Sequence, residues 1–462
     1  MWVGNSANGI STSMRVLVVG AGEVGFHLAQ RLSEEHQDVV VIEADPERAE
    51  TADQKLDVQT IVGNGASISI LEQAKVRDTQ MLLAVTSADE VNLTACLAAK
   101  RMGVPYTVAR ISNPDYYEED SVLSSDQVGI DLMVNPEKEC AREAFLLLQN
   151  IAFTEVAEFA GGRVQLVGLK VLDGAPVAGK SIGNLRSQFL PTGYHYVTAA
   201  IVRDGQTIIP RAETTIEAGD RLYLLAPTTE IDQVPPLAGY DRFKLKRVMI
   251  AGGSLEGQYI AELLGQHGIE CAILEQNRRR CIKLAEQLPH ALVLNADATD
   301  LEQLEMEGVR GVDGFVSATG RDETNLLSSL LAKQAGARKV LSLVHKFQYL
   351  KLESTAGVDS SISPRISTVN AILRRIRRGR VMTVASLSGI EAEAIEFVVT
   401  SESPIANKAL RDVDFPKNGV IGIILRGNEI ILPRGEDVLT SGDDVIVFAT
   451  PDAIPTVEAL FD

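Results

Sequence analysis

The sequence contains an internal duplication. The segment Arg15–Gly20 (RVLVVG) matches Arg247–Gly252 (RVMIAG), and further matches follow in the same order through small insertions. A second, different unit also repeats, because Ile201–Arg211 matches Ile424–Arg434. Ordered self-similarity over such a length is the signature of a repeated structural unit. We therefore expect four lobes in the order A, B, A′, B′, a tandem duplication of a two-lobe module.

Lobe A alternates two kinds of segment. Short β-branched apolar stretches are typical of strands that are buried on both faces, and the stretches between them have the 3.6-residue apolar spacing of helices. Six strands with intervening helices predict an α/β lobe with a Rossmann-like, doubly wound parallel sheet. Strands are expected at Arg15–Val19, Asp38–Ile42, Val58–Val62, Gln80–Thr86, Tyr106–Ile111 and Asp131–Val134, and helices at Val24–Ser33, Pro46–Lys55, Ser69–Lys75 and Asp89–Met102.

Lobe B has a different pattern, in which apolar and polar residues alternate along the strands. Asp204-Gly205 is a strong hairpin signal between two of them. This pattern predicts a small α+β lobe built on antiparallel strands, followed by a linker between the modules at Pro227–Phe243. Strands are expected at Val197–Arg203, Thr207–Pro210 and Arg221–Ala226.

These patterns also give expected domain boundaries. Residues 1–13 are polar and are predicted to be a disordered tail, with either Met1 or Met14 as the start of the protein. The first Rossmann-like lobe is expected at 14–150 and its small partner at 151–232. The second pair is expected at 246–381 and 382–462.

Charge and composition exclude several classes of function. The chain has 44 Lys and Arg against 62 Asp and Glu, a net charge of −18, which repels nucleic acid and anionic lipid. No stretch approaches the ~18 apolar residues that a membrane span needs. The four cysteines form no CxxC pair and no His, Cys and Glu spacing suggests a metal, so neither a metal site nor a disulfide framework is expected. The sequence therefore predicts a cytoplasmic protein without nucleic-acid partners.

The first lobe carries a glycine motif in the context that gives it meaning. It directly follows an expected strand and opens an expected helix. Gly20 permits a tight turn, Gly22 lets a pyrophosphate approach the backbone and Gly25 lets the helix pack on the sheet. The full motif is Gly20, Ala21, Gly22, Glu23, Val24 and Gly25.

Glu43 stands at the end of the next strand, where a carboxylate can accept hydrogen bonds from a ribose diol. The same carboxylate would repel a 2′-phosphate. The motif therefore predicts NAD(H), ADP or ATP in preference to NADP. The alternative is a glycine turn that binds nothing.

The second lobe has a weaker copy of this motif. Ser254 replaces the middle glycine, and its Cβ is expected where a pyrophosphate should pass. Glu275 keeps the ribose position. A weak nucleotide site and a degenerate one are both open. The copy is Gly252, Gly253, Ser254, Leu255, Glu256 and Gly257.

Polar residues at the ends of later strands would complete each pocket, because open α/β sheets bind ligands beyond their carboxyl edge. For Thr86 and Ser87 the alternative is that they cap the following helix and do not contact a ligand. The candidates are Asn64, Thr86, Ser87 and Arg110 in the first lobe and Asp297 and Thr319 in the second.

No catalytic constellation is evident. None of the six histidines is expected after the fourth, fifth or sixth strand of a Rossmann-like lobe, where a substrate would face a nicotinamide ring. A binding protein is therefore favoured over an enzyme, and the alternative is an NAD-dependent oxidoreductase whose active site is unrecognised. Five arginines between Arg374 and Arg380 form either a solvated helix end or a contact with an acidic partner or with phosphates.

Several motifs together resemble a known family, the peripheral regulatory subunits of Trk-type bacterial potassium uptake systems, whose modules are called RCK or KTN domains. The resemblance covers essentially Met14 to Asp462. Its signals are Val18–Gly25 (VVGAGEVG), Ala84–Asn92 (AVTSADEVN), Ala109–Ile111, Pro114–Tyr116, Val420–Ile423 and Arg426-Gly427.

The resemblance implies a function. Gly20–Gly25, Glu43, Thr86 and Arg110 correspond to nucleotide contacts of the first lobe, and Gly252–Glu256 with Glu275 to those of the second. A homotetrameric ring is implied beneath a separate membrane subunit that conducts potassium, with NAD(H), ATP or ADP as regulatory ligands. The small lobes resemble TrkA-C domains. Two departures are Ser254 and Asn64, since related lobes often carry an acidic residue at the latter position.

Overall fold

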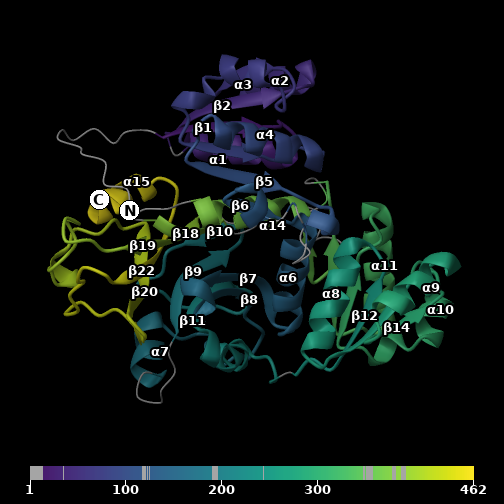
Figure 1. Ribbon diagram of the computed structural model, residues 1–462. Coiled ribbons are helices and arrows are strands. Elements are labelled where there is room, and N and C mark those ends of the chain that lie inside the picture. The colour runs from purple at the N-terminus through teal and green to yellow at the C-terminus, as the bar shows by residue number, and fades with distance from the viewer. Residues whose placement is uncertain are drawn as a thin grey trace. The chain divides into compact units, whose positions relative to one another are not determined.

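The computed structural model describes residues 14–34, 36–116, 121, 123, 125–189, 196–242, 244–346, 349, 357–376, 381–386 and 392–462 (Figure 1). The expected tail at 1–13 lies outside this part, as do Arg377, Arg378 and Arg380 of the arginine cluster. The described residues form four sheets, two of six parallel strands and two of five antiparallel strands. None of the described helices is long and apolar enough to cross a membrane.

The first Rossmann-like lobe confirms the expected six parallel strands. Their order in the sheet is β3-β2-β1-β4-β5-β6. The order reverses between β1 and β4, which opens a crevice beyond the carboxyl edge of the sheet. The strands are β1 (Arg15–Val19), β2 (Asp38–Glu43), β3 (Gln59–Val62), β4 (Met81–Ala84), β5 (Tyr106–Arg110) and β6 (Leu132–Val134).

The helices of this lobe begin close to the positions expected for them. α2 shows why: Asp45 caps it by accepting from the Glu47 N–H, and Pro46 occupies the first turn, where its missing N–H costs nothing. The helices are α1 (Glu23–Glu34), α2 (Pro46–Lys55), α3 (Ile68–Gln73), α4 (Asp89–Arg101) and the short α5 (Ser125–Val128).

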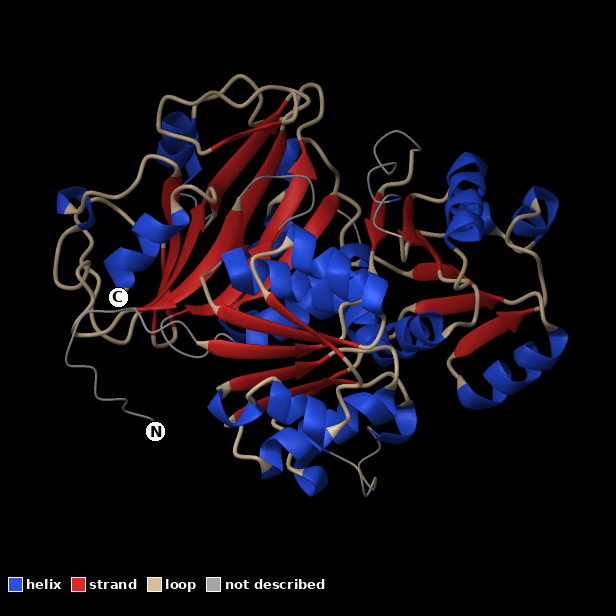
Figure 2. Cartoon of the chain, turned by 90° about the horizontal axis from the view of Figure 1, so that it is seen from above, coloured by secondary structure: helices blue, strands red, loops and turns tan. Residues whose placement is uncertain are grey.

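The second Rossmann-like lobe repeats this topology, with the strand order β14-β13-β12-β15-β16-β17. Figure 2 shows strands and helices side by side in each parallel lobe. The strands are β12 (Arg247–Ala251), β13 (Glu270–Leu274), β14 (Ala291–Leu294), β15 (Gly314–Ser317), β16 (Lys339–Leu343) and β17 (Ser360–Ile362), and the helices are α8 (Leu255–Gln266), α9 (Arg278–Gln287), α10 (Leu301–Met306) and α11 (Asp322–Ala335).

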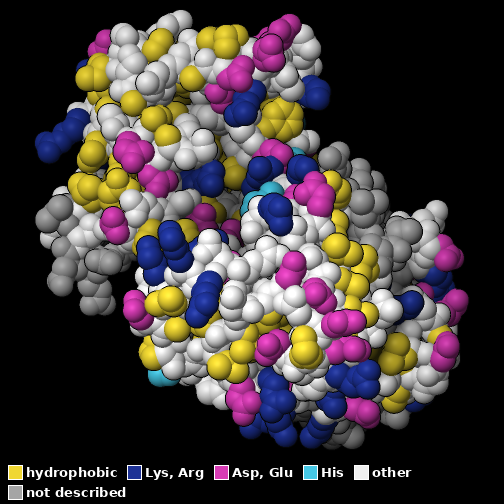
Figure 3. Space-filling view, turned by 90° about the vertical axis from the view of Figure 1, so that its right-hand side faces the viewer, with side chains coloured by type: hydrophobic (Ala, Val, Ile, Leu, Met, Phe, Trp, Pro, Cys, Tyr) yellow, Lys and Arg dark blue, Asp and Glu magenta, His cyan; other side chains and the backbone are white. Residues whose placement is uncertain are grey.

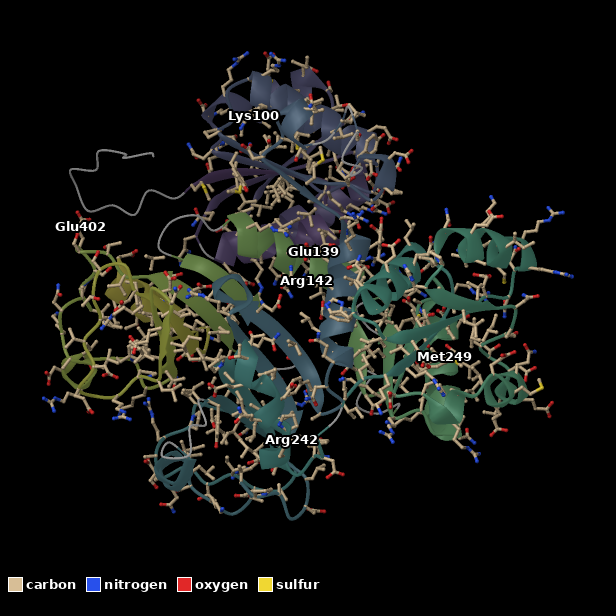
Figure 4. The ribbon with its side chains drawn as sticks, turned by 60° about the horizontal axis from the view of Figure 1, so that its bottom comes forward. Lys100, Glu139, Arg142, Arg242, Met249 and Glu402 are labelled. Carbon is tan, nitrogen blue, oxygen red and sulfur yellow. The ribbon has the colours of Figure 1, made fainter. Side chains whose placement is uncertain are left out.

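One ion pair shows how closely the duplication is kept. In the first lobe, Lys100 on α4 (labelled in Figure 4) lies with its Nζ 2.7 Å from Asp131, beside β6. In the second lobe, Lys333 on α11 lies 2.7 Å from Asp359, beside β17. Each aspartate also accepts from a backbone N–H of the neighbouring strand. The same charge pair thus fastens the last strand of both sheets.

Two helices leave the Rossmann-like lobes, and neither stays with the lobe it follows. α6 (Pro136–Leu148) places its second half, including Phe145 and Leu148, in the core of the second lobe with Val248. α14 (Pro364–Ile376) follows the second lobe, yet residues 365–372 belong to the compact unit of the first lobe. The duplicated lobes therefore exchange helices, a feature that the sequence patterns did not predict.

The two small lobes are antiparallel, as expected. Their strand orders, β10-β9-β11-β8-β7 and β18-β19-β22-β20-β21, correspond one to one. Asp204 and Gly205, with φ of 51° and 78°, form the predicted hairpin turn. The strands are β7 (Phe153–Phe159), β8 (Val164–Lys170), β9 (Val197–Arg203), β10 (Gln206–Ile208) and β11 (Arg221–Pro227), then β18 (Val381–Ser386), β19 (Glu393–Val398), β20 (Gly419–Arg426), β21 (Glu429–Ile431) and β22 (Asp444–Ala449), with α7 (Ile182–Phe189) and α15 (Ile454–Phe461).

The small lobes share one apolar core. Phe159 and Tyr223 from the first sheet pack in one cluster with Phe448 from the second. A Cβ at Gly422 would lie 2.3 Å from a Leu225 methyl, so the two sheets approach too closely there for a side chain. The two small sheets therefore bury their apolar faces against each other.

The segment expected to be a linker is mostly packed. Val234, Leu237 and Ala238 are buried in the core of the first small lobe. The prolines 235 and 236 begin a short 3-10 turn rather than a free connection. Proline and glycine were correct signals for irregular backbone here, but they did not signal exposure.

Candidate functional site

The glycine loop of the first lobe lies between β1 and α1, at the crevice. Gly20 has a φ of +103°, and a Cβ there would lie 3.0 Å from the Thr86 methyl. A Cβ on Gly25 would lie 1.8 Å from the Gly20 carbonyl oxygen. Gly22 is different, since a Cβ there would meet nothing within 4 Å. Packing within the protein therefore explains Gly20 and Gly25, whereas Gly22 faces open space that a ligand could enter.

Glu43 holds this loop from the end of β2. Its side chain is buried, and one carboxylate oxygen accepts from the Ala21 N–H. The other accepts from the Asp45 N–H at 2.9 Å. A carboxylate has about four acceptor positions, so two remain for a ribose hydroxyl. Glu43 thus has a structural task besides the ribose contact predicted from the sequence.

The remaining members of the motif divide between the core and the surface. Val24 and Ala21 are buried, and Glu23 is exposed at the start of α1. Asn64 is exposed and accepts from the Ala66 N–H at 2.9 Å, so it shapes its own turn. Ser87 is exposed at the end of β4.

Asn92, on α4, joins the ends of β4 and β5. Its Oδ1 accepts from the Thr86 N–H at 2.9 Å and from the Thr86 hydroxyl at 2.7 Å. Its Nδ2 donates to the Thr86 and Arg110 carbonyls at 3.0 and 2.8 Å. Sequence reasoning did not choose Asn92 as a site residue, although it lies in the AVTSADEVN motif. Its role is to position Thr86 and Arg110 at the same edge of the sheet.

Arg110 brings a cation to this edge. Its Nε is buried without a hydrogen-bond partner, and its Nη1 lies 3.5 Å from the Thr86 carbonyl. Burial lowers the pKa of Arg110, and the charge of Arg365 lowers it further, while Glu137 and Asp89 raise it. A half-buried guanidinium whose Nε–H is buried and unpaired is costly, and a bound anion would relieve that cost.

The glycine loop of the second lobe has the same backbone arrangement as that of the first. Gly252 has a φ of +99°, and a Cβ there would lie 2.6 Å from the Thr319 Cα. Glu275 accepts from the Gly253 N–H at 3.3 Å, as Glu43 accepts from Ala21. Thr319 is held by Asn325 through bonds of 2.8 and 2.7 Å. The backbone geometry is therefore duplicated.

The side chains around the second loop differ from the first. Ser254 caps α8, because its hydroxyl accepts from the Gly257 N–H at 3.2 Å. That N–H belongs to the helix end where a phosphate would bind. Arg280 donates to the Gly253 carbonyl at 2.8 Å and lies 3.7 Å from Glu275. Leu255 is exposed, and Asp297 accepts from Thr299 within its own turn.

A histidine also lies at this pocket, and it corrects the expectation that none follows the later strands. His345 comes two residues after β16, the fifth strand of its lobe. Its Nδ1 lies 2.9 Å from an Asp322 oxygen, and its Nε2 lies 3.9 Å from a Glu256 oxygen. The sequence does not mark the end of β16, because the apolar run continues through Val344 up to His345.

The pKa values of His345, Glu256 and Asp322 are linked, because each carboxylate interacts with the imidazole. The carboxylates of Glu256 and Asp322 raise the pKa of His345 despite its burial. Burial alone would raise the pKa of Glu256, but its interactions with His345 and Ser254 outweigh burial, so this pKa is lowered. The second pocket therefore holds a carboxylate in the first turn of its helix. Leu343 occupies the end of β16, as Arg110 ends β5.

No group of three His, Cys, Asp or Glu residues in the described ranges is arranged to hold a metal ion, and all four cysteines are buried. Figure 3 shows acidic and basic side chains interspersed over the face in view. Of the arginine cluster, Arg375 is described and exposed, whereas the side chain of Arg374 is outside the description.

Comparison with known proteins decides the family. The TrkA-N domain family matches residues 16–136 and 248–364, and the TrkA-C domain family matches 166–239 and 394–462. The Trk system potassium uptake protein TrkA homolog 1 of Methanosarcina mazei is 36% identical over 456 residues, which are 97% of this chain and 100% of that protein. The chain belongs to the TrkA family.

Other comparisons agree. TrkA of Halomonas elongata, another Trk system potassium uptake protein, is 36% identical over 453 residues, 97% of this chain and 98% of that one. The crystal structure of the GsuK RCK domain has a TM-score of 0.59 and 17% identity, covering 98% of this chain and 95% of that one. The GsuK channel bound to NAD has a TM-score of 0.60 and 18% identity, covering 98% and 79%. The TrkA family thus shares the RCK fold seen here, and the expected fold class is confirmed.

Proposed function

We propose that this chain is a peripheral regulatory subunit of a potassium uptake system. It binds NAD(H), ATP or ADP at the first glycine loop and thereby gates a separate, membrane-embedded potassium-translocating subunit. The single observation that carries the ligand is the open space at Gly22, where a side chain would meet no atom within 4 Å. The buried Nε of Arg110, which has no hydrogen-bond partner, supports it. The family membership supports the potassium uptake role, and the NAD in the name of the GsuK channel structure supports the ligand.

The residues of the first lobe have distinct tasks in this proposal. The N–H groups of Gly20–Gly25 and the N-terminus of α1 hold the phosphates, since a helix N-terminus attracts anions. Glu43 accepts from the ribose hydroxyls while it holds the Ala21 N–H. Arg110 pairs with a phosphate at the edge that Asn92 positions. The bound nucleotide supplies binding free energy and no reaction.

Regulation then requires two states of the assembly. A nucleotide shifts their equilibrium only by its difference in affinity for them. We propose a homotetrameric ring on the inner face of the membrane, held there by the membrane subunit. The four lobes at 14–150, 151–232, 246–381 and 382–462 are its proposed units, with the small pair serving assembly.

The second loop is proposed to bind phosphates more weakly. Its helix end carries the Ser254 cap and the Glu256 carboxylate, and Leu343 supplies no cation there. An NAD-dependent oxidoreductase is the alternative function. It has a specific observation in its favour, the His345–Asp322 pair beside the second glycine loop.

The test is calorimetric titration of ATP, ADP, NAD⁺, NADH and NADPH into the full chain and an Arg110→Gln variant. Arg101→Gln, an exposed arginine on α4, is the control. Loss of one charge-assisted contact of ~1.5–3 kcal/mol weakens binding by roughly 10- to 100-fold in Arg110→Gln only. Equal affinities in all three proteins would refute the site, binding of NADPH alone would refute the role of Glu43, and consumption of NADH with 2-oxo acids would favour the oxidoreductase.

A further inference from the structure

Arg365 links the first glycine loop to a distant part of the sequence. It is the second residue of α14, the helix that follows the last strand of the second Rossmann-like lobe (Figure 1). Within the compact unit of the first lobe, its guanidinium forms an ion pair with Glu23. Glu23 is the first residue of α1 and lies inside the glycine motif. A cation from far along the chain therefore lies against the loop that is proposed to hold phosphates.

The surroundings of Arg365 are unusual for a surface ion pair. The pKa of Arg110 is lowered mainly by burial, and the positive charge of Arg365 acts in the same direction. Arg110 already carries a buried Nε without a partner. Glu137 and Asp89 act on Arg110 with the opposite sign and offset part of this lowering. Through its pair with Glu23, Arg365 lies at the N-terminal end of a twelve-residue helix, where the partial positive charge of the helix adds to its own.

An anion at this position would remove the conflict. Two guanidiniums can share one phosphate through charge-assisted hydrogen bonds. Glu23 competes for this position, because it is an exposed carboxylate that already pairs with Arg365. Its side chain is 46% exposed and that of Arg365 is 36% exposed, so the pair can open without unfolding the lobe.

We propose that Arg365 is a phosphate-binding residue of the first nucleotide site, which leaves Glu23 when the ligand binds. This inference rests on the proposed nucleotide function and adds a contact between the bound phosphate and α14. The phosphate fastens α14 to the glycine loop of the first lobe. In sequence, α14 is followed by the second small lobe.

The experiment is calorimetric titration of ADP and of adenosine into the full chain, with variants on both sides of the pair. Arg365→Gln weakens ADP binding by roughly tenfold, the effect of one charge-assisted contact. Glu23→Gln has the opposite sign and strengthens ADP binding, because the competing carboxylate is gone. Adenosine, which has no phosphate, binds all variants equally.

Arg77 and Glu72 provide the matched control, since they are another arginine–glutamate pair in the same lobe, 4.0 Å apart and exposed. Arg77→Gln and Glu72→Gln leave ADP affinity unchanged. If wild type binds ADP and both Arg365→Gln and Glu23→Gln match these controls, or change affinity in the same direction, Arg365 has only a structural role and the inference is wrong. If the wild-type chain binds no nucleotide, the proposed function itself fails.

Discussion

Lys339 gives the sharpest prediction about stability. It is the first residue of β16 and is fully buried, with 1% of its surface exposed. Its Nζ donates to the carbonyl oxygens of Leu147, Asn150 and Phe153 at 2.5, 2.8 and 2.5 Å. These carbonyls belong to the end of α6 and the turn into β7. The amino group of Lys339 therefore joins the second Rossmann-like lobe to the start of the first small lobe.

Lys339→Met retains most of the buried aliphatic volume and removes the three donors. Each orphaned buried acceptor costs about 1–3 kcal/mol, and the desolvation of the ammonium that is no longer required offsets part of the sum. The expected loss in the free energy of unfolding is about 3 kcal/mol, in the range found when a buried charge partner is removed. Lys333→Met removes a lysine whose side chain is 37% exposed and should cost no more than about 1 kcal/mol.

The assay is urea unfolding of both variants, followed by far-UV circular dichroism. Backbone amide hydrogen exchange in α6 is measured as a second, local readout. Burial lowers the pKa of Lys339 to about 7, well under its value in an unfolded chain. The unfolded state therefore binds more protons above pH 7, and wild-type stability should rise from pH 7 towards pH 10 relative to Lys339→Met. If Lys339→Met is as stable as Lys333→Met, or if the two show the same pH dependence, the buried amino group of Lys339 does not stabilise the fold.

Three further predictions concern the two loops. Gly22→Ala should leave the melting temperature unchanged and weaken nucleotide binding in calorimetry. Gly25→Ala should lower the melting temperature, since its Cβ would lie 1.8 Å from a carbonyl oxygen. If Gly22→Ala lowered the melting temperature more than Gly25→Ala, the loop geometry would be contradicted. Asn92→Ala removes the bonds that hold two strand ends and should cost about 2–3 kcal/mol in urea unfolding, against less than 1 kcal/mol for the exposed Thr94→Ala. The pKa of His345 is raised in the folded state, so protonated His345 should stabilise the fold fully below about pH 6.5. This stabilisation should be lost as the pH rises through the folded-state pKa. A His345→Gln variant whose melting temperature depends on pH as in wild type would count against this.

Local patterns in the sequence were sufficient for the parallel lobes. The strand Arg15–Val19 and the helix Pro46–Lys55 have the predicted bounds, because a β-branched run and a proline after a capping aspartate specify them locally. β7 and β8 were not predicted. Phe153–Phe159 carries two glutamates on a strand whose apolar partners lie in other elements, so its own pattern is weak.

Long-range contacts explain what the sequence could not show about the site. The glycine loop and Glu43 were found because they are close in sequence and their spacing is fixed by one strand–helix–strand unit. Asn92, Arg365 and the Glu256–His345–Asp322 group depend on packing between elements that are far apart in sequence. The duplication offered one usable signal, since Asp89 and Asn92 recur as Asp322 and Asn325.

The proposed regulation depends on nucleotide binding at the first glycine loop. Calorimetry of the purified full chain with NADH and with ATP measures this binding and its stoichiometry. Saturable binding of at least one of them is expected, with one tight site per chain that Arg110→Gln weakens. No saturable binding of any adenine nucleotide, or tight binding that Arg110→Gln leaves unchanged, would contradict it.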